Sequence, residues 1–196
     1  MRATTPMRPR PSSTRTGAAA AFARASFAVA LACAGIAGLT AQSTAASPAA
    51  QRWCTAIPLP LGTRASSCRA LEVRAARGTL RLAVAANEKQ REHGLMNVRW
   101  VPPGQGMIFA FPDGDQLRGF WMKDTVTPLD MVFVTSDGTV TDVAVNVPAT
   151  APHTPDDKIA RRQAVAHYVI ELGAGQAGAF GLIPGARIFV PAVAAQ

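Results

Sequence analysis

The segment Gly119-Phe-Trp-Met-Lys-Asp-Thr-Val-Thr-Pro-Leu-Asp130 changes character halfway along, where large apolar side chains give way to charged and polar ones. Its first four residues are typical of a strand. Pro128 ends the regular structure, because proline has no amide hydrogen to donate to a sheet ladder. Successive side chains of a strand point to opposite faces. We therefore expect one face of this segment to pack in the core and the other to line a pocket.

The polar half of the segment supplies most of a candidate ligand-binding site. The predicted site residues are Met96, Trp121, Met122, Lys123, Asp124, Thr125 and Asp130. A lysine paired with a carboxylate stays charged and binds anions or carbonyl oxygens, whereas a buried lysine has a lowered pKa and can act as a base. The alternative for Lys123 is a structural ion pair at a strand end. For Asp130 we favour a role in tying backbone amides over a catalytic one.

Strand signals recur at intervals of about ten residues. Residues 71–74 and 80–84 alternate apolar and polar side chains around Arg77-Gly78-Thr79, which predicts a hairpin. Asp137-Gly138 predicts a second hairpin. The other predicted strands are 107–111, 119–122, 131–134, 139–147, 165–172 and 187–190.

Helical signals are few and short. Asn87 is a good N-cap and Gly94 a good stop, so the residues between them predict a short helix. Residues 148–163 combine prolines with two aspartates and predict an exposed loop, and 173–181 predict a short helix or loop. Many short strands without long crossover helices favour a mainly β (α+β) fold, a compact antiparallel barrel or sandwich with one or two short helices.

The first 45 residues predict a secretory signal peptide. Five of the twenty Lys and Arg residues precede residue 25, whereas no acidic residue occurs before Glu72. The apolar run 25–41 is followed by small residues, and it is shorter than the roughly 20 apolar residues of a membrane span. Without the leader the formal charge falls from +8 to +3. We expect export to the periplasm or the medium, an N-terminal arm at 46–69 and one domain at 70–192.

Cysteine usage fits an exported protein. Cys33 would leave with the leader, so Cys54 and Cys68 remain as an even pair in an oxidising compartment. A disulfide between Cys54 and Cys68 is the favoured interpretation, and two free thiols in the arm are the alternative.

Several ordered motifs together resemble the DUF192 (UPF0127) family, and the resemblance covers about residues 71–190. The motifs are Arg91-x-x-Gly94-Leu95-Met96, Gly106-Met107-Ile108-Phe109, Phe120-Trp121-Met122-Lys123-Asp124-Thr125, Pro128-Leu129-Asp130, Asp137-Gly138 and Tyr168-Val169-Ile170-Glu171. The chain departs from the family pattern at Asp124, where the family usually carries asparagine. The resemblance implies a compact β-rich domain, often exported, with no established biochemical activity.

The leading functional interpretation is a non-enzymatic module of the cell envelope that binds a small polar or anionic ligand or a partner's chain end. It follows from the apolar-to-polar switch and from the lack of a complete catalytic set in the sequence. No cofactor and no metal are expected. We also expect a monomer, no nucleic-acid partner, and membrane contact only through an uncleaved leader.

Three alternatives stay open. A hydrolase or lyase would use Lys123 and Asp124 as an acid and base pair. Copper handling would use thioethers, which favour Cu(I), although methionine is more often a core residue. In the last alternative, 119–130 is only a packing centre and the loop 148–163 carries the function. The sulfur and imidazole candidates are Met96, Met107, Met122, Met131, His93, His153 and His167.

Overall fold

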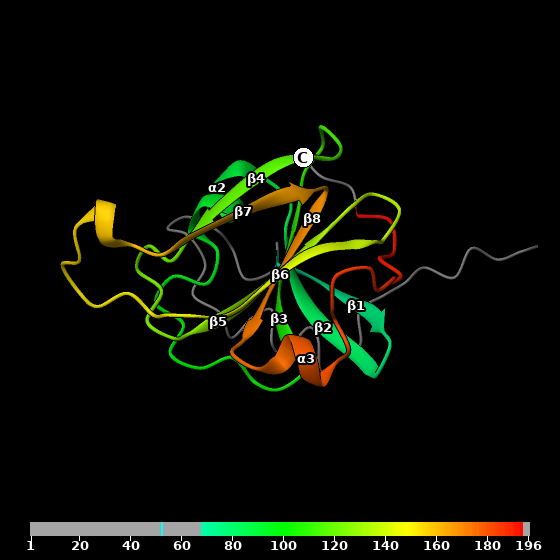
Figure 1. The fold of residues 1–196 in the computed structure, drawn as a ribbon, viewed down its shortest axis with the longest axis horizontal. Coiled ribbons are helices and arrows are strands. Elements are labelled where there is room, and N and C mark those ends of the chain that lie inside the picture. Colours follow the sequence, from blue (N-terminus) through cyan, green and yellow to red (C-terminus); the bar gives the residue numbers. More distant parts are fainter. Residues whose placement is uncertain (1–51, 53–67, 194–196) are drawn as a thin grey trace, which may run out of the picture. The chain divides into compact units, whose positions relative to one another are not determined.

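The computed structural model describes Arg52 and residues 68–193, all of which belong to one compact unit, residues 42–196. Figure 1 shows its strands and short helices. The strands are β1 (Arg69–Ala75), β2 (Gly78–Ala85), β3 (Gln105–Ala110), β4 (Gln116–Trp121), β5 (Leu129–Val134), β6 (Val140–Val147), β7 (Arg161–Ala166) and β8 (Tyr168–Gly173). The helices are α2 (Glu88–His93), α3 (Gln176–Ala179) and the 3-10 turn η2 (Asp156–Lys158). The predicted mainly β class is confirmed.

Six strands form one sheet in the order β1-β2-β3-β8-β5-β6, and β4 pairs with β7 in a separate two-stranded sheet. We call the second sheet the β4–β7 ribbon. All neighbouring strands are antiparallel except β2 and β3, which are parallel and are joined through α2. Within the described residues the large sheet stays open, with β1 and β6 at its edges, so the layered alternative applies rather than the barrel.

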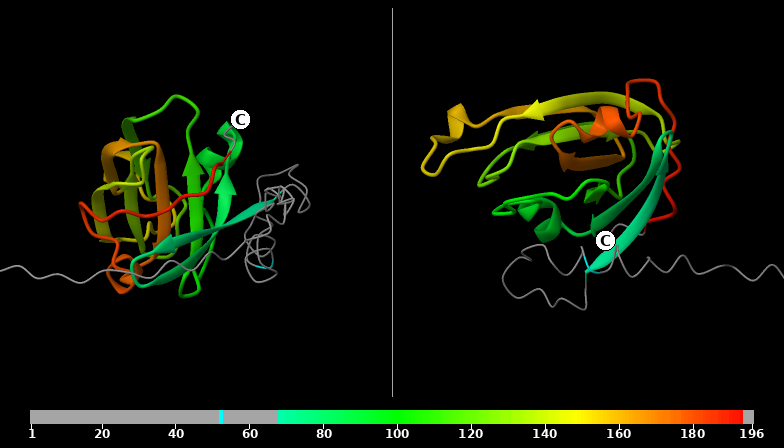
Figure 2. Two further views of the ribbon diagram at one scale, coloured as in Figure 1. Left: turned by 90° about the vertical axis from the view of Figure 1, so that its right-hand side faces the viewer. Right: turned by 90° about the horizontal axis from the view of Figure 1, so that it is seen from below.

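Both faces of the large sheet are apolar. One face, which includes Phe109 and Phe133, packs against the ribbon and the residues after α2. The other face, which includes Ile108 and Ile170, is covered by α3 and the C-terminal segment, drawn in red in Figure 2. Successive side chains of a strand point to opposite faces, and here both faces pack in a core. β5 and β8 are therefore buried along their whole length.

The local sequence explains the hairpin and the helix that precede the site. Arg74 pairs with Thr79 and Ala75 with Gly78 across the first turn, as the alternating pattern predicts. In α2, Asn87 and Gln90 form a reciprocal capping box, and the amide of Gly94 donates to the carbonyl of Gln90 at the other end. None of the described helices is both long and apolar enough to cross a membrane.

Three sequence-based boundaries were wrong. The run 165–172 is two strands, β7 and β8, which belong to different sheets and are separated by His167, whose amide donates to the carbonyl of Val134. The predicted loop 148–163 contains η2 and the first residues of β7. The predicted strand 187–190 makes only isolated bridges, one of them between Arg74 and Phe189.

The ribbon is far less buried than the large sheet. No residue of β4 is fully buried, and Ala166 is the only buried residue of β7. Figure 1 shows α2 next to β4 on the side of the ribbon away from β7. One edge of β4 therefore faces the helix rather than another described strand.

Candidate binding pocket

A pocket of about 550 Å³ lies between α2 with its following turn, the ribbon strand β4, and one face of the large sheet. The helix side contributes residues 88–96 in part, and β4 contributes 118–121. Two residues of the large sheet form the floor, Phe109 from β3 and Glu171 from β8. The site is thus assembled from segments far apart in the sequence.

Aromatic side chains make up most of the apolar lining. The rings of Phe109 and Phe120 meet edge to face with centroids 4.8 Å apart, and Phe111 meets Phe120 in the same way at 6.3 Å. Edge-to-face contact is a favoured geometry for aromatic pairs. The three phenylalanines join β3, the segment after it and β4 into one rigid apolar surface.

Gly94 closes the helix directly above the floor. Its φ is +51°, and a Cβ there would lie 3.3 Å from the Phe109 ring and 3.7 Å from a carboxyl oxygen of Glu171. A side chain at this position would be strained and would crowd the floor. The helix stop predicted from the sequence therefore also leaves space above Glu171.

Glu171 is the one ionisable group at the pocket floor. Its exposed fraction is 5%, and no hydrogen bond or ion pair of its carboxyl group is found among residues 68–193; its oxygens are not fully buried and face the pocket. Burial raises its pKa from 4.5 to about 8, because the charged form is poorly solvated there. At neutral pH the group is mostly protonated and offers one hydrogen-bond donor and one acceptor.

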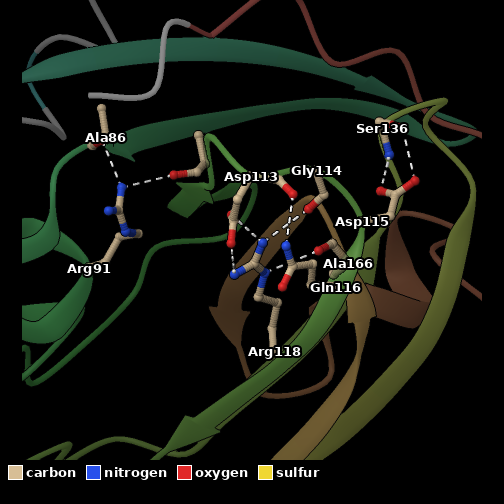
Figure 3. A network of polar contacts seen from close by, with 10 residues as sticks. Ala86, Arg91, Asp113, Gly114, Asp115, Gln116, Arg118, Ser136 and Ala166 are labelled. Carbon is tan, nitrogen blue, oxygen red and sulfur yellow. Dashed lines mark hydrogen bonds and ion pairs between the residues drawn. The ribbon is translucent and has the colours of Figure 1, made fainter.

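Arg118 on β4 forms the best-connected part of the rim, shown in Figure 3. Its guanidinium group binds both carboxylate oxygens of Asp113 and the carbonyl of Gly114, and it lies 4.1 Å from the centre of the Phe111 ring. The hydrogen bond from Arg118 lowers the pKa of Asp113. The charge of Arg118 is therefore already compensated by Asp113.

Arg91 holds α2 against the sheet. One guanidinium nitrogen donates to the carbonyls of Ala86 at 2.8 Å and Ala110 at 3.1 Å, and the group also lies over Phe111. Figure 3 shows this side chain reaching from the helix. Since its partners are neutral carbonyls, Arg91 keeps its positive charge at the rim.

Lys123 pairs with Asp156 rather than with its neighbour Asp124. The Lys123 ammonium group donates to Asp156 at 2.6 Å, and this hydrogen bond raises the lysine pKa. Both Lys123 and Arg161 also lie over the ring of Trp121, at 5.8 and 4.8 Å from its centre. Lys123 is therefore a charged, partnered group at the mouth of the pocket.

The structure brings four of the seven predicted site residues to this pocket: Met96, Trp121, Lys123 and Thr125. Met122, the residue after β4, is fully buried in the core on the same inward side as Phe120. Asp124 does not line the pocket; its carbonyl accepts a hydrogen bond from the amide of Asn97.

Asp130 has a structural position away from the pocket. Its fully buried carboxylate accepts hydrogen bonds from the amides of Asn146 at 2.7 Å and Ala177 at 2.8 Å. It thus joins β6 and the second residue of α3 to β5, which matches the predicted role of tying backbone amides. The amides belong to distant segments and not to its own turn.

The remaining sequence-based candidates have less to do with the pocket. Cys68 is disulfide-bonded, and its predicted partner Cys54 lies outside the described residues. Among the described residues no group of three His, Cys, Asp or Glu side chains could hold a metal ion. Met107 and Met131 are buried in the same core as Met122.

The residues of the pocket floor were not predicted from the sequence. Glu171 belongs to the motif Tyr168-Val169-Ile170-Glu171 but is not among the predicted site residues, although an acidic residue inside the run Tyr168–Leu172 stands out. In a strand buried on both faces, such a residue must be buried as well. Phe109 and Arg118 carried no signal of their own, because nothing local indicates that β3 and β4 face each other.

Comparisons with known proteins place the chain in a family without a known activity. The family model that matches residues 70–190 is DUF192, described as an uncharacterized ACR. No curated protein matches the chain.

Two solved structures are similar to the chain. One, from Sinorhizobium meliloti 1021, is described as a proposed transcription regulator and is 35% identical to this chain. The match covers 63% of this chain and 94% of that protein's chain, with a TM-score of 0.50. The other, from Novosphingobium aromaticivorans DSM 12444, is a protein of unknown function with 26% identity, 62% and 84% coverage and a TM-score of 0.49. Because the family model spans well over half of its length, the chain belongs to the DUF192 family.

Proposed function

We propose that this domain is a binding module that holds an uncharged polar group of its ligand in the pocket between α2 and β4. The observation that carries the proposal is Glu171, a buried carboxyl group at the floor of an open pocket with no partner among the described residues. A carboxyl group that is poorly solvated and has no protein partner costs free energy. A ligand that supplies the missing hydrogen bonds recovers that free energy.

The chemistry of the lining defines the class of ligand. A protonated Glu171 both donates and accepts, which matches an amide or a hydroxyl group. Phe109 and Phe120 offer an apolar surface for the body of the ligand. The rim charges of Arg118 and Lys123 are compensated by acidic partners. Arg91 is bonded to neutral carbonyls, but Glu88 and Glu92 line the same side of the pocket, so the rim gives little net attraction for an anion.

The enzyme and metal alternatives have less support. The raised pKa of Lys123 keeps its ammonium group protonated, so it is a poor general base. Asp124 does not line the pocket, so only Lys123 of the acid and base pair could reach a ligand there. Of the four methionines, only Met96 reaches the pocket, and the other three fill the core.

We place this function outside the cytoplasm, as an expectation from the sequence. The Arg-rich leader argues for export, and the disulfide at Cys68 fits an oxidising compartment.

The test is a binding titration with four probes that share one ring: benzamide, benzyl alcohol, benzoate and benzylammonium. Benzamide and benzyl alcohol are expected to bind most tightly at pH 7, and their binding is expected to weaken above about pH 8, where Glu171 loses its proton. Glu171→Gln keeps a donor and an acceptor, so it should retain benzamide binding and lose the alkaline decline. Glu171→Leu should lose binding roughly tenfold or more, as expected for a missing hydrogen-bonded pair.

Glu72→Gln serves as the control, because Glu72 is a half-exposed acid on β1 that pairs with Arg81 and does not line the pocket. It should leave all four affinities unchanged. Equal affinities of wild type and Glu171→Leu for every probe would rule out the proposed role of the floor.

A further inference from the structure

The hydrogen-bond pattern of β4 shows which of its backbone groups are used by β7. Phe120 is opposite Arg162 and Arg118 is opposite Ala164, and the amide of Met122 donates to the carbonyl of Ala160 in the same register. Opposed residues of an antiparallel pair alternate between those that exchange hydrogen bonds and those that do not. Met122, Phe120 and Arg118 therefore direct their amides and carbonyls toward β7.

The intervening residues direct their backbone groups the other way. By the same alternation, the amides and carbonyls of Leu117, Gly119 and Trp121 point to the edge of β4 that is away from β7. No strand of residues 68–193 pairs with that edge, and no hydrogen bond of these three backbones is found there. Opposite this edge the pocket opens, and Gly119 and Trp121 line it.

The edge faces α2 across the pocket (Figure 1), so an added strand would occupy the pocket itself. Gly119 stands at its centre, and on the outer face a Cβ built on it would meet nothing within 4 Å. Proteins commonly protect edge strands with prolines, charges or bulges, because an exposed edge is a template for another strand. The segment 117–121 shows neither a proline nor a break in register, and its one charge, Arg118, is bound to Asp113.

The two faces of the ribbon specify what an added strand would carry. Leu117 and Trp121 lie on the outer face with exposed fractions of 63% and 37%, and Val165, opposite Leu117, is exposed as well. Arg118 and Phe120 lie on the inner face, toward the floor of the pocket. An added strand would therefore place every second side chain beside an exposed apolar surface, and the others toward Phe109 and Glu171.

We propose that the occupant of the pocket is an extended polypeptide segment that adds to the free edge of β4 as a third strand of the ribbon. Its outward side chains are apolar and pack beside Leu117 and Trp121. One inward side chain carries an amide that pairs with Glu171. Only a polypeptide backbone offers alternating donors and acceptors at the spacing of a strand edge. This inference rests on the proposed function, of which it names the ligand class.

The experiment measures hydrogen exchange of individual amides by NMR in the presence of the peptide acetyl-Thr-Val-Gln-Val-Thr-Val-Thr-amide. Binding should slow the exchange of the Gly119 and Trp121 amides by roughly tenfold or more, because these amides gain a partner. The amides of Arg118 and Phe120 already donate to β7 and should change little. A peptide with N-methylvaline at its central position, which removes one donor, should bind roughly tenfold more weakly.

Three outcomes would overturn the inference. They are the absence of peptide binding, peptide binding that leaves Gly119 and Trp121 unchanged, and protection of these amides that rises with protein concentration without peptide. The last result would identify a second copy of the chain as the occupant.

The Gln-to-Leu version of the peptide separates this proposal from the proposed function. If both peptides protect the edge equally, strand addition is supported and the role of Glu171 fails. If benzamide binds through Glu171 but no peptide protects the edge, the role of Glu171 is supported and strand addition fails.

Discussion

The large sheet and the β4–β7 ribbon differ in how their strands are used. All six residues of β5 and all six of β8 are buried, with both faces in apolar cores and both edges paired. In β4 no residue is fully buried, and one edge has no partner strand among the described residues. The sheet thus supplies stability and holds Glu171 in place, whereas the ribbon supplies surface and backbone groups that folding has not used.

The largest expected effect concerns the one acid in the buried strand. The folded-state pKa of Glu171 is raised, so the native state binds a proton more tightly than the unfolded chain between pH 4.5 and about 8. Its contribution is complete below pH 4.5 and is lost as the pH rises to about 8. The free energy of unfolding is therefore lower above pH 8 than below pH 4.5 by at most about 5 kcal/mol, at 1.36 kcal/mol per pH unit.

Urea denaturation of wild type and Glu171→Gln at several pH values measures this contribution. The stability of wild type relative to the variant should fall between pH 5 and 8 and be level above that range. A relative stability independent of pH would show that Glu171 is solvated or paired.

The second expected effect compares one large side chain in each region. Phe133→Ala removes a fully buried ring from β5 and should destabilise the protein by about 3–5 kcal/mol. Leu117→Ala on the outer face of β4 should change stability by less than about 0.5 kcal/mol. Equal losses in urea denaturation would mean that the outer face of the ribbon is covered.

The contrast between the regions also explains what the sequence could reveal. The hairpin of β1 and β2, the capped helix and the run of strands follow from alternation, caps and turns, which are local. The division of 165–172 between two sheets is not local, because both strands read as one apolar run and only tertiary pairing separates them. The same limit applies to the pocket, since Trp121 and Lys123 could be selected from their own segment but Phe109 and Glu171 join them only in the folded chain.

A third effect tests the hydrogen bonds by which Asp130 links β5 to β6 and α3. Asp130→Ala leaves the amides of Asn146 and Ala177 without their acceptor and should destabilise by about 2–4 kcal/mol, since both bonds are made to a charged group. Asp130→Asn keeps one acceptor oxygen and should lose less. Thermal unfolding of the two variants provides the comparison. If both changes were harmless, the carboxylate would not organise this end of the sheet.

The smallest effects separate two glycines of the pocket. Gly94→Ala introduces a side chain at a positive φ and against Phe109, and should destabilise by about 1–2 kcal/mol. Gly119→Ala adds a methyl group in open space on a strand and should be neutral or stabilise by up to about 1 kcal/mol. A clear loss of stability in Gly119→Ala, measured by urea denaturation, would show that the outer face of the ribbon is packed.

The most direct test of the binding site is the titration of the Glu171 side-chain carboxyl carbon by NMR, with and without benzamide. The expected pKa is about 8 in the free protein and higher with benzamide, because a ligand that prefers the protonated form holds the proton more tightly. A pKa near 4.5 that benzamide leaves unchanged would contradict the account, because the pocket floor would then be solvated and would not take part in binding.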